Sequence, residues 1–216
     1  MVRSLKSRLD RHFVACSAAA AAATVAVVPQ QSAEAAIVYS GVVNINIPST
    51  TAGVYVNFVT GLNSSVPASV PGWDVNPWST TALNYFNPGA PAGGVYVQGG
   101  GTGTNTANLV PGTLISAASV YGAGTAASTG LLPHVFNSSN NIVGFRFQNE
   151  ANGNATHYGW MRISLSATFG AQPRAIVEYA YENVAGAGIN AGDVPTPGSL
   201  ALLALGAVGL AGRRRR

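Results

Sequence analysis

The chain has 216 residues, with 11 lysines and arginines, 7 aspartates and glutamates and a formal net charge of +4. Eight of the basic residues lie near the two ends, whereas residues 36–194 contain three arginines and five acidic residues. A weakly charged, net acidic central region carries no basic patch, so the composition excludes nucleic-acid binding as the default function.

The first 35 residues have the pattern of a secretory signal peptide. Basic residues up to Arg11 precede an apolar, alanine-rich stretch over residues 13–28, and Ala33 and Ala35 then supply the small side chains that signal peptidase requires. We predict a signal helix over 1–35, export through the Sec translocon and cleavage after Ala35. A short alanine-rich helix packed on the domain is the alternative. The only cysteine, Cys16, lies in this segment, so the exported chain has no disulfide and no cysteine nucleophile.

Residues 36–182 are predicted to form an all-β body. No window carries an apolar helical period, and short alternating runs are instead separated by turn residues. Roughly eight to ten short strands at fairly even spacing favour an antiparallel β-sandwich or jelly-roll-like fold. The expected strands are 43–47, 54–59, 73–75, 83–86, 95–98, 114–115, 142–148, 157–166 and 175–181.

The clearest hairpin joins residues 142–148 to residues 157–166 through a polar connector with an Asn-Gly turn signal. Gly144 and Gly159 lie inside these strands, which indicates close backbone approach or room for a neighbouring aromatic ring. In the following strand, Val177, Tyr179 and Tyr181 are expected on one face.

Few residues of the body are suited to catalysis or metal binding. His134 and His157 show no metal-ligand spacing, and Glu178 and Glu182 would lie about 13 Å apart along a strand, too far for a glycosidase pair. A pair from different strands, such as Glu150 with Glu178, stays open, and a hydrolase would need two carboxylates within about 5–10 Å in a cleft. We predict no enzymatic activity, no catalytic residue, no cofactor and no metal. Arg146 is expected to pair with Glu178 or Glu182.

Three tryptophans give the only positive hint of a ligand. Trp73, Trp78 and Trp160 have flat aromatic faces suited to stacking on sugar rings, and core packing is the alternative. Trp73 and Trp78 lie in a segment rich in proline, glycine and asparagine, so they are the better candidates for exposure.

The C-terminal region has two parts. Residues 183–194 are rich in glycine, alanine and asparagine and are predicted to be a flexible linker. The segment 195–216 contains Pro195, Thr196 and Pro197, an apolar run over 200–211 and a final cluster of Arg213, Arg214, Arg215 and Arg216. The apolar run and its neighbours would form a helix of about 22 Å, which is shorter than the ~30 Å hydrocarbon core of a bilayer. The long arginine side chains can extend to the membrane surface and so compensate for the difference. We expect a transmembrane helix with the arginine cluster in the cytoplasm.

This three-part tail resembles the PEP-CTERM sorting signal of exported Gram-negative proteins. The resemblance implies processing near the Pro-x-Pro motif by an exosortase, a membrane cysteine peptidase. The usual motif has glutamate between the prolines, where this chain has Thr196. Residues 143–147, 156–162, 176–182 and 191–193 are also similar to a module in exported PEP-CTERM proteins of undefined function, which implies co-occurrence with the tail rather than a chemistry.

We therefore expect an exported protein of the cell surface or extracellular matrix, with a structural or adhesive role and at least transient membrane anchoring by its C-terminal helix. A carbohydrate-binding module of lectin-like sandwich type, which recognises exopolysaccharide, is the alternative. A polysaccharide hydrolase and an uncleaved membrane protein of the same topology are the further alternatives.

Overall fold

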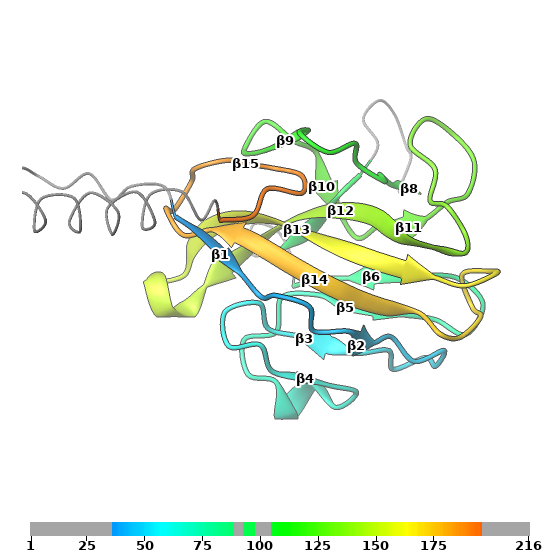
Figure 1. Ribbon diagram of the computed structural model, residues 1–216. Helices are drawn as coiled ribbons and strands as arrows, with labels where there is room; N and C mark the ends of the chain where they lie inside the picture. Colours follow the sequence, from blue (N-terminus) through cyan, green and yellow to red (C-terminus); the bar gives the residue numbers. More distant parts are fainter. Residues whose placement is uncertain (1–35, 89–92, 98–104, 196–216) are drawn as a thin grey trace, which may run out of the picture. The chain divides into compact units, whose positions relative to one another are not determined.

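The computed structural model describes residues 36–88, 93–97 and 105–195, which form strands and two short 3-10 helices (Figure 1). In chain order these are β1 (Ile37–Tyr39), β2 (Ile45–Asn46), β3 (Tyr55–Val56), β4 (Asn63–Ser64), η1 (Pro67–Ser69), β5 (Asn76–Trp78), β6 (Asn84–Phe86), β7 (Gly94–Tyr96), β8 (Asn105–Thr106), β9 (Leu114–Ile115), β10 (Tyr121–Gly122), β11 (Thr125–Ala126), β12 (Ser138–Asn149), η2 (Glu150–Asn152), β13 (Ala155–Leu165), β14 (Ala175–Glu182) and β15 (Ile189–Asn190). The prediction of an all-β body is confirmed.

A seven-stranded antiparallel sheet is the centre of the fold. Its order is β1-β14-β13-β12-β7-β10, and β2 also pairs with β14. The predicted hairpin is confirmed as β12 and β13, and it turns through η2, Gly153 and Asn154. Both turn residues have a positive φ, of 61° and 60°, which glycine and asparagine tolerate better than other residues.

Three smaller sheets complete the body. The four-stranded sheet has the order β5-β6-β11-β8, and its β8–β11 pair is parallel, whereas the other pairs are antiparallel. The strands β9 and β15 form one two-stranded sheet, and β3 and β4 form another. Isolated bridges join Val56, in β3, to Val75, just before β5, and Val97, just after β7, to Thr106, in β8. The four-stranded sheet is thus linked to the β3–β4 pair and to the large sheet.

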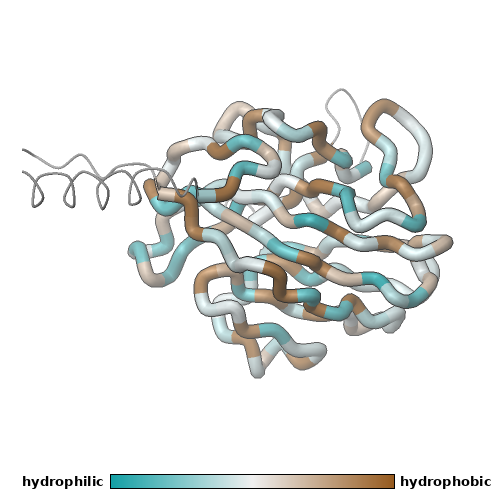
Figure 2. The backbone as a smooth tube through the Cα atoms, viewed as in Figure 1, coloured by the Kyte–Doolittle hydropathy of each residue, from teal (hydrophilic) through white to brown (hydrophobic). Residues whose placement is uncertain are grey.

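The large sheet is buried on both faces. Period-two alternation along β12 sends Phe145 and Phe147 into one apolar cluster, where β3, β6 and β11 also pack, and sends Ile142 into the other. The second cluster lies under β9 and β15 and includes Trp160 and Ile189. Brown and teal segments accordingly alternate along the backbone (Figure 2).

The side-chain alternation predicted for β14 is wrong at one position. The pairing register between β13 and β14 shifts between Arg162 and Ile163, so Ile176 enters the core and Val177 is only half-buried. The backbone N–H groups of Val43 and Asn44 both donate to the Val177 carbonyl, so this irregularity lies where β2 joins the sheet.

The expected ion pair of Arg146 is also wrong. Arg162 forms the pair with Glu178, with 2.6 Å between Nε and Oε1. Arg146 instead places its guanidinium 4.9 Å from the centre of the Tyr121 ring and donates to the Gly93 carbonyl.

Residues 183–194 do not form the predicted free linker. Residues Ile189–Asn190 are strand β15, paired with β9, and Ile189 and Ala191 are 3% and 1% exposed. The Trp160 indole donates to the Asp193 carbonyl at 2.9 Å. The linker prediction overlooked Ile189, the one isoleucine of this segment. Burial of its apolar side chain holds the segment against the body.

The signal helix predicted over 1–35 lies outside the described residues, and so does the transmembrane helix predicted in the tail. None of the helices within the described ranges has the length and apolar character needed to cross a bilayer.

Candidate functional site

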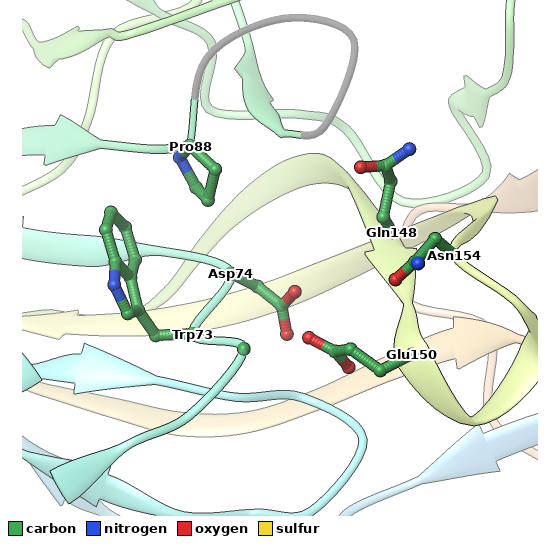
Figure 3. A pocket seen from close by; sticks show the side chains of 7 residues that line it. Trp73, Asp74, Pro88, Gln148, Glu150 and Asn154 are labelled. Atoms are coloured by element: carbon green, nitrogen blue, oxygen red, sulfur yellow. The ribbon is translucent and has the colours of Figure 1, made fainter. Parts of the chain in front are cut away.

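A pocket of about 190 Å³ lies at the tip of the β12–β13 hairpin (Figure 3). Its walls come from three segments that are distant in sequence: the stretch before β5, the loop after β6, and the end of β12 with the hairpin connector. The lining residues are Gly72, Trp73, Asp74, Pro88, Gln148, Glu150 and Asn154. Two carboxyl groups, two carboxamides and an indole therefore share one small space.

Asp74 is the buried acid of this pocket. Its side chain is 5% exposed, and its Oδ2 accepts a hydrogen bond of 2.7 Å from the Phe58 backbone N–H. Burial raises the pKa of Asp74 to about 8, the Phe58 N–H opposes this rise, and the nearby Glu150 adds to it. At neutral pH the Asp74 carboxyl is therefore mostly protonated and is able to donate a hydrogen bond as well as accept one.

Glu150 faces Asp74 from the other side of the pocket, and their carboxyl groups point toward one another in Figure 3. Glu150 is exposed and begins η2. Its carboxylate lies against Gly72, whose φ of +64° suits glycine, and a Cβ at this position would overlap that carboxylate. The Pro71 and Gly72 carbonyls both accept from the Asn57 side-chain amide, which holds this turn in place.

Trp73 forms the aromatic wall. Its half-buried indole meets the Tyr55 ring edge-on with 5.0 Å between centroids, and lies 5.6 Å from the Phe86 ring at an angle of 31°. Phe86 is 51% exposed, so the aromatic surface continues outward from the pocket. The two neighbouring rings fix the orientation of the indole, which leaves a preformed flat face for a ligand.

The three predicted tryptophans do not form a common groove. Trp160 is fully buried, in contact with Tyr39 and Arg162, so it is not available for stacking and that prediction is corrected. Trp78 is half-buried on β5 and does not line the pocket, which Trp73 alone of the three reaches.

The two histidines of the body lie apart from the pocket lining. Both are buried: His157 Nδ1 lies 2.7 Å from the Glu182 carbonyl oxygen, and the His134 ring packs edge-on against the Phe169 ring. Across residues 36–88, 93–97 and 105–195, no three histidine, cysteine or acidic side chains gather as a metal site would require.

Most of the pocket was missed by sequence reasoning. The Asn-Gly turn signal marked the hairpin tip that carries Glu150 and Asn154, but no pattern linked that tip to Asp74. The link is three-dimensional, because Asp74 precedes Val75, which bridges to Val56 and so holds this stretch against β3.

The predicted processing residues lie almost wholly outside the described ranges. These are Ala33, Ala35, Thr196, Pro197 and the cluster Arg213, Arg214, Arg215 and Arg216, whereas Pro195 is described and exposed.

Comparison with protein families matches residues 193–216 to the PEP-CTERM protein-sorting motif. The match covers the end of the chain and leaves the body and its pocket unassigned. Comparisons with curated proteins and with solved structures gave no match. The predicted PEP-CTERM sorting signal is thus confirmed, and it indicates an exported protein that an exosortase-like enzyme sorts through a membrane-anchored C-terminus.

Proposed function

We propose that this PEP-CTERM exported protein is a non-enzymatic adhesin of the cell surface or extracellular matrix that binds a saccharide unit of exopolysaccharide in the Trp73 pocket. The observation that carries the proposal is the meeting of one oriented indole with four hydrogen-bonding side chains in that pocket. Sugars present an apolar C–H face and a rim of hydroxyl groups, so they match an aromatic plane bordered by carboxyl and carboxamide groups.

The charges of the pocket indicate which sugars it accepts. Glu150 contributes a carboxylate and the described lining residues include no arginine, so uronic acids and other anionic sugars are disfavoured by like charge. We propose neutral or amino sugars as the ligands. The protonated Asp74 carboxyl supplies a donor for a sugar oxygen, whereas the Gln148 and Asn154 carboxamides supply both donors and acceptors.

A polysaccharide hydrolase is the second candidate, because two facing carboxyl groups of unlike protonation are also what glycoside hydrolysis needs. The binding proposal is favoured because Asp74 is almost fully buried and is held by the Phe58 N–H. A general acid must reach the glycosidic oxygen between two sugar units, which is harder for a carboxyl group that is buried and held in this way.

Titration of the exported protein with neutral, amino and acidic oligosaccharides, measured by isothermal titration calorimetry, tests this proposal. Trp73→Ala is expected to weaken binding at least tenfold, which corresponds to about 1.4 kcal/mol. Trp78→Ala is the matched control and is expected to bind as the wild type does, because Trp78 is half-buried but outside the pocket.

Two outcomes would contradict the proposal. Equal weakening by both tryptophan variants, or preferred binding of acidic sugars, would remove the pocket as the binding site. Release of new reducing ends from exopolysaccharide, abolished by Glu150→Gln, would establish the hydrolase instead.

A further inference from the structure

Glu182 is a buried carboxylate at the end of β14, and its surroundings hold backbone N–H groups rather than a basic side chain. The residue is 3% exposed, and its Oε1 accepts hydrogen bonds of 3.0 Å from the backbone N–H of Ala36 and of Val184. Buried carboxylates are costly unless a cation or several donors balance them.

Each arginine of the described body is engaged elsewhere. Arg162 pairs with Glu178, Arg146 lies over Tyr121, and Arg174 donates to backbone carbonyls. The titratable neighbour of Glu182 across the sheet is His157, whose ring contacts the Glu182 backbone carbonyl rather than its carboxylate. Among the described residues, the carboxylate is therefore without a basic side-chain partner.

One of the two donors that reach Glu182 is the nitrogen of Ala36, the residue just before β1. β1 pairs Ile37 with Glu182, and the Asn183 N–H donates to the Ala36 carbonyl, so Ala36 is held at the edge of the sheet. The signal-peptidase site predicted from Ala33 and Ala35 places the cut at the bond before this nitrogen.

From this coincidence we infer that Glu182 is the receptor for the mature N-terminus, which is created by cleavage between Ala35 and Ala36. Hydrolysis of this peptide bond consumes one water molecule and leaves a carboxylate on Ala35 and an α-ammonium group on Ala36. The ammonium nitrogen is the atom that already lies 3.0 Å from Glu182 Oε1. Export thus replaces a neutral N–H donor with a charged one, so that the hydrogen bond to the Glu182 carboxylate becomes an ion pair that fixes β1 at the edge of the large sheet.

The composition of the chain gives a direct test. Lys6 is the only lysine and lies in the signal segment, so a product that begins at Ala36 has a single primary amine. The full chain, expressed with its own signal segment in a Gram-negative host, is purified after export, and its N-terminus is sequenced. Acetylation of that amine at pH 7.5 then reports the pKa of the α-amino group, because only the uncharged amine reacts.

The first expected result is an N-terminus at Ala36. An adjacent carboxylate raises the pKa of the α-amino group above its usual ~8, so the folded wild type is expected to react about tenfold more slowly than Glu182→Gln. Glu178→Gln is the matched control: it removes a carboxylate from the same strand, but one that contacts Tyr39 and Arg162. This control is expected to react at the wild-type rate.

The wild-type protein unfolded in urea is a reference that needs no variant. Its amine is expected to react about tenfold faster than in the folded state, and this comparison decides the matter if Glu182→Gln does not fold. Equal rates in the folded and unfolded wild type, or an N-terminus at any residue other than Ala36, would overturn the inference.

Discussion

At the scale of single residues, the body accommodates two buried ionisable groups in opposite ways. The buried guanidinium of Arg174 donates to five backbone carbonyls, which balance its charge without an acid: Ile47, Pro48, Ser79, Ala82 and Phe169. Asp74 accepts a hydrogen bond from the Phe58 N–H and faces another carboxyl group. Arg174 is therefore suited to the charged state and Asp74 to the neutral one.

The raised pKa of Asp74 predicts that the body loses stability as the pH rises. An acid with a pKa of about 8 in the folded chain and 3.8 unfolded binds more protons when folded, so the free energy of unfolding falls as the pH rises between these values. We expect a fall of about 1–2 kcal/mol between pH 6.5 and 8, measured by urea denaturation. Asp74→Asn is expected to remove this fall.

The pH range is chosen to separate Asp74 from His134. Burial lowers the pKa of His134 to about 4, so this residue costs stability only when the pH falls below its unfolded value of 6.5. Glu150→Gln is the second variant, because removal of its charge lowers the pKa of Asp74 and reduces the fall without abolishing it. The same pH dependence in the wild type and in Asp74→Asn would show that Asp74 ionises normally.

At the scale of elements, the central hairpin could be predicted because it is encoded locally. Alternating residues in β12 and β13 and the Asn-Gly turn between them specify strands, faces and register together. The irregularity at Val177 depends on the pairing of β2 with β14, and the packing of β15 depends on its pairing with β9. Because each partner strand is distant in sequence, neither feature could be predicted from the local residue pattern. The Asp74 pocket was missed for the same reason, since its walls come from separate elements.

One element-scale expectation, the role of the strand glycines, is confirmed at Gly159 but not at Gly144, and it leads to a mutational prediction. A Cβ at Gly159 would overlap both the Phe145 ring and the Ala180 carbonyl, whereas a Cβ at Gly144 would lie 3.0 Å from the Leu109 methyl group, at the end of a flexible side chain. Gly159→Ala is therefore expected to destabilise the fold by about 1–3 kcal/mol.

Gly144→Ala is the matched control and is expected to cost clearly less than Gly159→Ala, because its neighbours can change rotamer. Chemical denaturation of both variants gives the comparison. Equal destabilisation would mean that the cost of adding a Cβ arises from the strand backbone itself. Contact of β13 with β12 or β14 would then not be its cause.

At the scale of the whole molecule, each end of the described body is held by a hydrogen bond close in sequence to a predicted processing segment. The Ala36 nitrogen contacts Glu182 at the start of β1, and the Asp193 carbonyl accepts from Trp160 just before Pro195. The PEP-CTERM match begins at residue 193, just beyond β15. Cleavage near the Pro-x-Pro motif would therefore keep β15 and the Trp160–Asp193 hydrogen bond.

This arrangement predicts the product and its stability together. We expect intact-mass spectrometry of envelope and medium fractions to find a chain that runs from Ala36 to about residues 194–197 and lacks Arg213–Arg216. The variant Thr196→Glu restores the usual motif and is expected to increase the yield of this product. Such a product should unfold at the temperature of the tailed protein, because β15 and the Trp160–Asp193 hydrogen bond are kept. A chain ended after Gly188 loses the burial of Ile189 and orphans the Trp160 N–H, so it should be about 3–5 kcal/mol less stable. A membrane product that retains the arginine cluster would contradict cleavage and leave the tail as a permanent anchor.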